Sequence, residues 1–175
     1  SFEIIYFTEK KPLGTAGALY QLKNTLKKKF LVFYADTIFN INLKKLILFD
    51  SKRSSEGCLV CHPNDHPNDS DLIEFDFSNR IVKIHPYPHT NKYYANNVNA
   101  AMYILSPKVF EYIDPKKKSD LAKHVFPKMI LKETLIAYKT VEFIKDVGTK
   151  NRISMLRKIL RKKDGLEASL PIKKN

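Results

Sequence analysis

The sequence has few cysteines, few arginines and no long hydrophobic run. Its longest uninterrupted apolar stretches, residues 30–35 and 100–105, span six residues each, whereas a membrane-spanning helix needs about 18 to 20. This shortage excludes a transmembrane helix and predicts a soluble chain. The 43% content of hydrophobic residues is enough to bury a core, which excludes a disordered protein, and 175 residues fit one domain.

The chain begins at Ser1, without a methionine and without the basic and then apolar pattern of a secretory leader. We therefore expect no signal peptide and a native N-terminus that lies upstream. The two cysteines, Cys58 and Cys61, are too few for a disulfide framework. They are three residues apart on an expected strand, so they point to opposite faces and suit a shared metal poorly. We predict two buried, reduced thiols in a cytoplasmic protein.

Basic residues outnumber acidic ones by 31 to 18, which gives a net charge of +13 and favours an anionic partner. Arginine is scarce, however, and bidentate recognition of bases and phosphates favours arginine over lysine. The lysine runs at 27–29, 116–118 and 162–163 also fall at expected helix ends and loops. Nucleic acid is therefore an unlikely partner, and small phosphorylated substrates explain the charge equally well.

Short apolar runs alternate with helical stretches, which predicts an α/β fold. Residues 30–34 form a continuous apolar run, the kind that is buried on both faces of a parallel sheet. Residues 72–76 and 80–85 have hairpin spacing. The other expected strands are 1–7, 57–61, 98–105, 134–139 and 141–144. The expected helices are 16–29 with Thr15 as N-cap, 43–51 with Asn42 as N-cap, a helix after Ser106-Pro107, 120–131 and 150–163. We predict a domain that spans residues 1–163, followed by a linker at residues 164–175.

The most informative stretch is Glu-Lys-Lys-Pro-Leu-Gly-Thr-Ala-Gly-Ala at 9–18, between the first expected strand and helix. Small residues at this position let a ligand approach the backbone amides at a helix N-terminus. A tight turn without a ligand is an equal alternative, because a glycine-rich loop alone is a weak signal.

This stretch resembles the nucleotide-binding segment of the sugar nucleotidyltransferases, which join a nucleoside triphosphate and a sugar 1-phosphate into an NDP-sugar and pyrophosphate. The resemblance implies a Rossmann-like, mixed and mostly parallel sheet flanked by helices. A carboxylate at Glu9 can accept from both N1–H and the 2-amino group of guanine, which favours GTP. The residues that the resemblance assigns to the nucleotide are Glu9, Pro12, Leu13, Gly14, Thr15 and Gly17.

Two aspartates match the metal positions of that family. Asp36 follows an apolar strand, and Asp146 precedes Val-Gly-Thr; the resemblance implies that they hold one Mg²⁺ beside the α-phosphate. A lone aspartate at a strand end is more often an ordinary turn residue. The attacking sugar phosphate is already ionised, so no general base is needed. Lys145 and Lys123 are candidate phosphate contacts, the first at the catalytic centre and the second on the sugar side.

The run Val-Asn-Ala-Ala-Met-Tyr at 98–103 looks like the strand that lines the sugar pocket in this family, which assigns Asn99 and Ala101 to the sugar. A buried asparagine satisfied by the backbone is an equal alternative. The histidine- and proline-rich runs at 62–72 and 85–89 resemble nucleotidyltransferases of D-glycero-D-manno-heptose biosynthesis that are attached to a haloacid-dehalogenase-like (HAD) phosphatase domain. This resemblance implies a heptose 1-phosphate substrate and a fused or downstream phosphatase domain. Candidate walls of the sugar pocket are His62, His66, His85 and His89.

The resemblance covers residues 2–152 and aligns with the latter two-thirds of a complete domain of this family. The Gly-Gly-x-Gly-Thr-Arg loop and the Pro-Lys-Pro segment are missing, and Ala35 and Ala101 replace glycines. We therefore expect an N-terminally truncated domain that is inactive in this form. The alternatives are a basic binding or regulatory module that has lost the chemistry, and another enzyme of the family, such as a mannose-1-phosphate guanylyltransferase.

Overall fold

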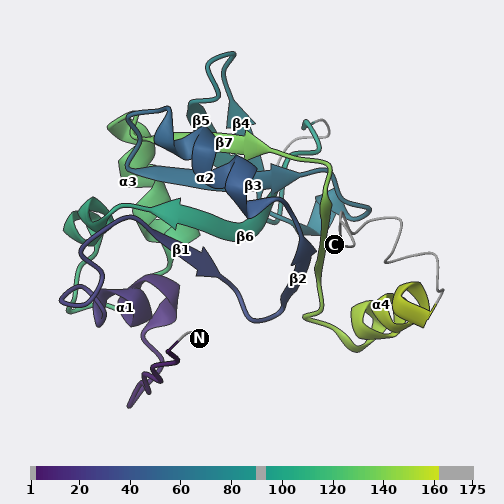
Figure 1. The fold of residues 1–175 in the computed structure, drawn as a ribbon, viewed down its shortest axis with the longest axis horizontal. Coiled ribbons are helices and arrows are strands. Elements are labelled where there is room, and N and C mark those ends of the chain that lie inside the picture. The colour runs from purple at the N-terminus through teal and green to yellow at the C-terminus, as the bar shows by residue number, and fades with distance from the viewer. Residues whose placement is uncertain (1–2, 90–93, 162–175) are drawn as a thin grey trace, which may run out of the picture.

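The computed structural model describes residues 3–89 and 94–161. A mixed sheet with helices on both faces forms the centre of the fold (Figure 1). Its strands follow the order β5-β4-β6-β3-β7, with β1 also paired to β6. A second, two-stranded sheet consists of β2 and β8. The strands are β1 (Phe30–Phe33), β2 (Thr37–Asn40), β3 (Gly57–His62), β4 (Leu72–Phe75), β5 (Ile81–His85), β6 (Val98–Leu105), β7 (Leu135–Lys139) and β8 (Phe143–Asp146).

The helices cover the two faces of the large sheet. A core on one face joins β3 and β6 to α1 and α3, and a second core on the other face joins them to α2. The helical elements are α1 (Gly14–Tyr20), α2 (Leu43–Ser51), α3 (Phe126–Leu131), α4 (Lys150–Arg161), the 3₁₀ turns Pro67–Asp69 and Pro107–Tyr112, and the π-helical turn Leu121–Val125. None of the helices in the described ranges is long and apolar enough to cross a membrane.

The α/β class and the mixed, helix-flanked sheet are confirmed, but the expectation of mostly parallel strands is wrong for the described residues. Only β3 and β7 pair in parallel, and β6 runs antiparallel to β1, β3 and β4. The continuous apolar run at 30–34 indicates a strand that is buried on both faces, and such strands are typical of parallel sheets. Helices on both sides bury an antiparallel central strand just as well, so the apolar run does not decide strand direction.

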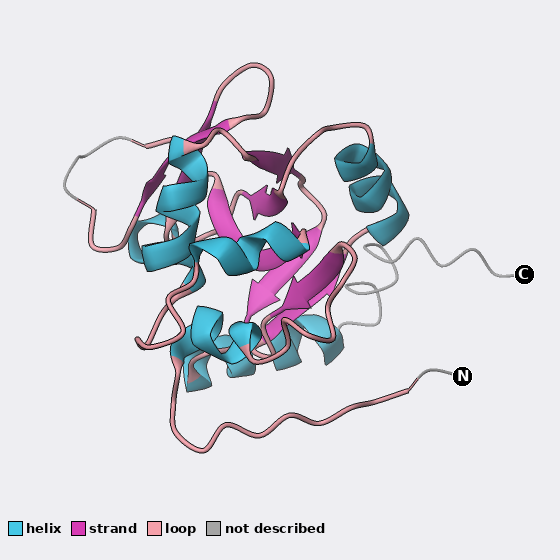
Figure 2. Cartoon of the chain, turned by 90° about the vertical axis from the view of Figure 1, so that its left-hand side faces the viewer, coloured by secondary structure: helices cyan, strands magenta, loops and turns pink. Residues whose placement is uncertain are grey.

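Two expectations about the N-terminal region are also wrong. Residues 3–7 form no strand, and Ile5 and Tyr6 are exposed; Figure 2 shows this segment as a loop that runs along the edge of the fold. A strand needs a neighbour, and none of the described strands pairs with it. The first helix ends at Tyr20 rather than at residue 29, and Thr15 lies inside it rather than at its cap.

Most other local expectations are confirmed. Asn42 caps α2 by accepting from the Lys45 amide at 3.0 Å, and β4 and β5 form the expected hairpin. Cys58 and Cys61 are buried, unpaired thiols in the two different cores, and burial raises the pKa of Cys61 to about 12. The expected helix at 120–131 divides into the π-helical turn and α3. The expected linker at 164–175 lies outside the described residues.

Candidate active site

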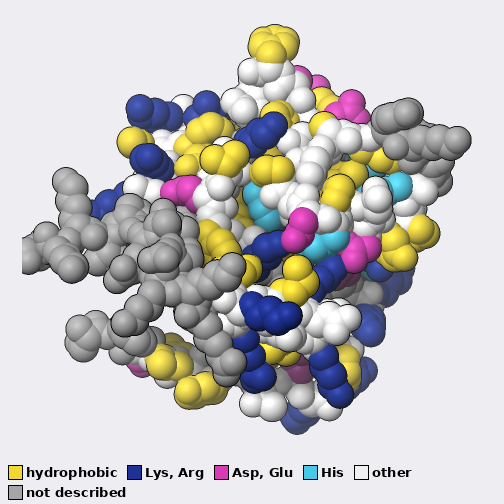
Figure 3. All heavy atoms as spheres, turned by 90° about the vertical axis from the view of Figure 1, so that its right-hand side faces the viewer, with side chains coloured by type: hydrophobic (Ala, Val, Ile, Leu, Met, Phe, Trp, Pro, Cys, Tyr) yellow, Lys and Arg dark blue, Asp and Glu magenta, His cyan; other side chains and the backbone are white. Residues whose placement is uncertain are grey.

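A cavity of about 350 Å³ lies where β2 and β8 cross the ends of β3 and β6. β3 contributes its last residue, and β6 contributes its first residues. Figure 3 views the molecule from the right-hand side of Figure 1 and shows histidine, carboxylate and basic side chains side by side on this face. Eight residues that the sequence assigned to chemistry or to the sugar pocket line this cavity: Asp36, His62, His66, Asn99, Ala101, Lys123, Lys145 and Asp146.

Asp36 and Asp146 lie next to each other because β2 and β8 pair antiparallel. Thr37 is opposite Asp146 in the register, and the Val147 amide donates to the Asp36 carbonyl at 2.7 Å. A Cβ placed on Gly148 would lie 3.7 Å from both Asp146 Oδ1 and Asp36 Oδ2. The two carboxylates therefore face the same small space, although they are far apart in the sequence.

This pair of carboxylates suits a magnesium ion. Mg²⁺ in nucleotide enzymes is commonly held by one or two carboxylates, with phosphates and waters completing its shell. No group of three or more histidine, cysteine or acidic side chains within residues 3–89 and 94–161 is arranged to hold a metal without such help. Two carboxylates would leave most of the coordination positions of the ion to phosphate oxygens and water.

Asp146 is surrounded by positive and hydrogen-bonding groups. Arg152, in the first turn of α4, donates from Nη1 to Asp146 Oδ1 at 2.6 Å. The Nε2 atom of His66 lies 3.4 Å from Asp146 Oδ2, and the Gly148 amide donates to Oδ1 at 3.4 Å. These contacts hold the carboxylate in one orientation and balance its charge.

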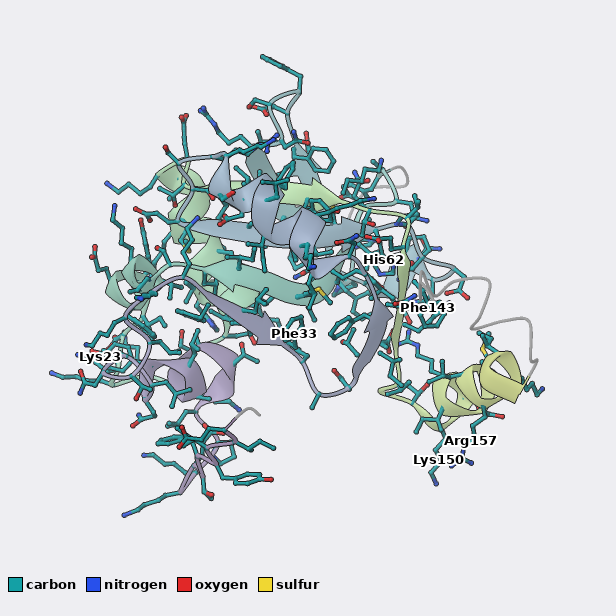
Figure 4. The ribbon with its side chains drawn as sticks, in the orientation of Figure 1. Lys23, Phe33, His62, Phe143, Lys150 and Arg157 are labelled. Atoms are coloured by element: carbon teal, nitrogen blue, oxygen red, sulfur yellow. The ribbon has the colours of Figure 1, made fainter. Side chains whose placement is uncertain are left out.

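The histidine-rich segment between β3 and β4, residues 62–71, forms one side of the cavity, and we call it the 62–71 loop. His62 and His66 line the cavity, as the sequence predicted. His62 is only 7% exposed, and burial lowers its pKa, which favours the neutral form of the imidazole; Figure 4 shows it at the end of β3. His85 and His89 instead pack against Tyr94 with tilted rings, outside the lining of this cavity.

Two acids of the 62–71 loop bind basic residues from β8 and α4. Lys145 Nζ lies 2.7 Å from Asp65 Oδ1, and this hydrogen bond lowers the pKa of Asp65. Arg152 Nη2 lies 2.7 Å from Asp69 Oδ2. Partial burial acts to raise the pKa of Asp69, but the hydrogen bond and charge of His66 and the charge of Arg152 outweigh it and lower the pKa overall.

Asn99 and Ala101 are joined within β6 by a hydrogen bond from backbone to side chain. Ala101 has φ of +53°, a left-handed conformation that favours glycine, and its amide donates to Asn99 Oδ1 at 3.2 Å. This geometry explains why glycine is expected at this position. The asparagine therefore has a backbone partner as well as a place in the cavity wall.

The predicted nucleotide segment lies behind the cavity wall rather than in it. Gly14 has φ of +78°, and a Cβ there would meet the Ser119 carbonyl oxygen at 2.4 Å. The Ala16 and Gly17 amides both donate to that oxygen, so they are not available to cradle a phosphate in this structure. The Leu13 amide donates to Glu9 Oε1 at 3.0 Å. None of Glu9, Pro12, Leu13, Gly14, Thr15 and Gly17 lines the cavity.

Asp120 and Arg152 are cavity residues that sequence reasoning missed. Asp120 Oδ1 accepts from the Ala122 and Lys123 amides, and its Oδ2 accepts from Thr15 Oγ1 at 2.8 Å. It thus joins the glycine-rich segment to the cavity. An aspartate before the stretch 121–131 is a recognisable helix cap, which was the available signal. No sequence feature indicated that Arg152 belongs to the site, apart from its position in a basic helix.

Comparison with known proteins identifies the family of this chain. The model of the family described as nucleotidyl transferase matches residues 1–162. The chain belongs to the nucleotidyl transferase family. A relative, the mannose-1-phosphate guanylyltransferase catalytic subunit beta of Drosophila melanogaster, is 31% identical over 149 residues, covering 83% of this chain and 40% of that protein. The mannose-1-phosphate guanyltransferase of Saccharomyces cerevisiae is also 31% identical, over 83% of this chain and 41% of that protein.

Solved structures of other proteins share the nucleotidyl transferase fold. HddC from Yersinia pseudotuberculosis superposes with a TM-score of 0.72 at 23% identity, covering 87% of this chain and 65% of that one. A putative glucose-1-phosphate thymidylyltransferase from Bacillus anthracis gives the same TM-score at 16% identity, over 98% of this chain and 67% of that one. These likenesses establish the fold. The chain spans about two-fifths of the length of the mannose-1-phosphate guanylyltransferases that it matches.

Proposed function

We propose that the protein containing this chain transfers GMP from GTP to a sugar 1-phosphate, which yields a GDP-sugar and pyrophosphate. The observation that carries the proposal is the convergence of Asp36 and Asp146 on one point of the cavity. Membership of the nucleotidyl transferase family and the similarity to two guanylyltransferases support it.

The residues of the cavity suit nucleotidyl transfer. Asp36 and Asp146 would hold Mg²⁺, which when bound neutralises the α-phosphate and the leaving pyrophosphate. Lys123 lines the cavity beside Asp120, and Lys145 and Arg152 add two further positive charges. The attacking phosphate oxygen is already ionised, so no group of the chain has to remove a proton from it. The chain must instead orient this oxygen opposite the leaving pyrophosphate.

The proposed base preference rests on Glu9. One of its oxygens accepts from the Leu13 amide, and this hydrogen bond fixes the carboxylate at the start of the glycine-rich segment. A fixed carboxylate suits the two neighbouring donors of guanine, N1–H and the 2-amino group, better than the edge of any other common base. A structure of HddC complexed with GMP-PN is among the proteins of the same fold.

We propose a sugar 1-phosphate of the manno configuration as the acceptor. The guanylyltransferases that resemble this chain are named for mannose 1-phosphate, and D-glycero-D-manno-heptose 1-phosphate, which the histidine-rich runs favour, keeps that configuration. Asn64, Ser70 and Asp71, all from the 62–71 loop, line the cavity, and polar side chains of these types can bind sugar hydroxyls. A HAD phosphatase domain in the same protein stays a prediction.

The test is pyrophosphate release by the whole protein with GTP, CTP, UTP or dTTP, with mannose 1-phosphate and the heptose 1-phosphate as alternative acceptors. We expect GTP to be preferred, and Glu9→Gln to lower the preference about tenfold, because the amide keeps the contact to Leu13 but replaces one acceptor by a donor. Glu3→Gln is the matched control. A preference for a pyrimidine nucleotide would contradict the assignment of Glu9, and no turnover with any nucleotide would favour a non-catalytic binding module.

A further inference from the structure

The cavity contains two kinds of basic side chain. Lys123 forms no ion pair with the described residues, whereas Lys145 and Arg152 are each bound to an acid of the 62–71 loop. Asp65 binds Lys145 and Asp69 binds Arg152, both at 2.7 Å. The loop therefore places one carboxylate on each of these two cations, at the side of the cavity where Asp36 and Asp146 converge.

The cations of these pairs are better shielded than the acids. The side chains of Lys145 and Arg152 are 28% and 27% exposed, while those of Asp65 and Asp69 are 52% and 47% exposed. Met155 and Leu156 of α4 line a small adjoining cavity together with both cations. A partly desolvated cation needs an anion beside it, but a half-exposed carboxylate can return to water at little cost.

We propose that Lys145 and Arg152 are phosphate-binding residues, and that Asp65 and Asp69 occupy them until a phosphate arrives. The inference rests on the proposed function for the presence of a phosphorylated substrate. Carboxylate and phosphate present similar oxygen pairs to a guanidinium fork, and phosphate carries more charge. The lowered pKa values of Asp65 and Asp69 agree with carboxylates that stay ionised while they hold these positions.

The exchange has a consequence for the loop. When phosphate binds Lys145 and Arg152, Asp65 and Asp69 turn to water, and the loop loses these two ion pairs, while His66 keeps its contact with Asp146. Arg152 also releases Asp146, which it holds through Nη1 at 2.6 Å. A single incoming phosphate would thus loosen the loop and remove the Arg152 contact from one of the two converging carboxylates.

Pyrophosphate is the probe, because it carries neither base nor sugar. Its binding is measured by calorimetry in EDTA, so that no divalent ion contributes. Arg152→Ala is expected to weaken binding about tenfold or more, and Arg152→Lys to restore part of the loss. Asp65→Asn and Asp69→Asn are each expected to tighten binding about two- to fivefold. Each variant removes a carboxylate that competes with phosphate, and the exposed ion pair that it forms contributes only a small free energy. Asp114→Asn, an exposed acid paired with Lys117 outside the cavity, is the control for overall charge.

A double variant distinguishes competition between Asp69 and phosphate for Arg152 from simple charge repulsion between Asp69 and phosphate. If Asp69 competes with phosphate for Arg152, Asp69→Asn no longer tightens binding once Arg152→Ala has removed that contact. Through-space repulsion would be relieved equally in both backgrounds, and that result would overturn the proposal. Weaker or unchanged pyrophosphate binding in both Asp→Asn variants would also overturn it. Because no nucleotide is present, neither result decides the base preference or the acceptor sugar.

Discussion

The two sides of the cavity are held together by different forces. On one side, the glycine-rich segment is fixed to Ser119 and Asp120 mainly through backbone hydrogen bonds, with Gly14 packed against the Ser119 carbonyl. On the other side, the 62–71 loop is fixed to β8 and α4 by side-chain ion pairs through Lys145 and Arg152. Backbone bonds in close packing resist salt and ligands, whereas half-exposed ion pairs respond to both.

The difference indicates that the two sides of the cavity have different roles. The backbone-bonded side gives the cavity a fixed shape and places Asp120 and Lys123 in its wall. The ion-paired side contains the converging aspartates and the groups that we assign to phosphate, so it changes when a charged substrate enters. Substitutions on the two sides should therefore differ in how much stability they cost and in how that cost depends on salt.

Gly14→Ala should have the largest effect. An added Cβ meets the Ser119 carbonyl oxygen at 2.4 Å, and φ of +78° disfavours any residue with a side chain. We expect a loss of about 2 to 4 kcal/mol in the free energy of unfolding, measured in urea. Ala18→Gly in the same helix is the control for helix propensity and should cost about 0.5 to 1 kcal/mol. An equal cost for both variants would show that the close contact is unimportant.

Arg152→Met should cost less, about 1 kcal/mol, because it removes partly exposed ion pairs with Asp69 and Asp146. The cost should fall by at least half in 1 M salt, where charges are screened within about 3 Å. The cost of Gly14→Ala should stay the same in that salt. Equal salt dependence of the two variants would remove the contrast between the two sides.

Ala101→Gly should stabilise the protein by about 0.5 to 1 kcal/mol, since alanine at φ of +53° is strained. Thermal unfolding measures the change. Ala100→Gly is the matched control in the same strand, and it should destabilise the fold, because Ala100 is buried and glycine weakens a strand interior. Destabilisation by both variants would contradict the strain at Ala101.

The smallest effect concerns pH and His62. Its pKa in the fold is lowered, mainly by burial, from the ordinary value of 6.5. Between these two values the unfolded chain binds more protons than the folded one, so stability should fall as pH falls below about 6.5. Urea unfolding at pH 7.5 and 5.5 should show a smaller fall in His62→Gln than in the parent protein. His124→Gln, at an exposed position, is the control.

Local patterns predicted the strands that form the core. The apolar run of β6 and the hairpin spacing of β4 and β5 are short-range signals, and both elements are present. Residues 3–7 have the same kind of apolar pattern but no partner among the strands of residues 3–89 and 94–161, and strand formation depends on such a distant partner. The prediction of mostly parallel strands was wrong for the same reason, because a sequence indicates which residues are buried but not which strands pair.

The site was predictable where a motif places a residue at a strand end. Asp36 and Asp146 follow that rule, and the pairing of β2 with β8 brings them together. The contacts of Arg152 with Asp69 and His66 join two segments that are distant in the sequence. No spacing rule predicts such contacts, because they depend on how the 62–71 loop folds over β8.

We propose that Asp36 and Asp146 hold one divalent ion between them, and the other roles assigned to the cavity depend on this ion. Binding of Mn²⁺, followed by electron paramagnetic resonance, tests it without depending on turnover. We expect Asp36→Asn and Asp146→Asn each to weaken Mn²⁺ binding about tenfold or more, and Asp71→Asn, another acid of the cavity wall, to have a much smaller effect. Mn²⁺ affinity that is unchanged in either Asp36→Asn or Asp146→Asn would contradict the shared site.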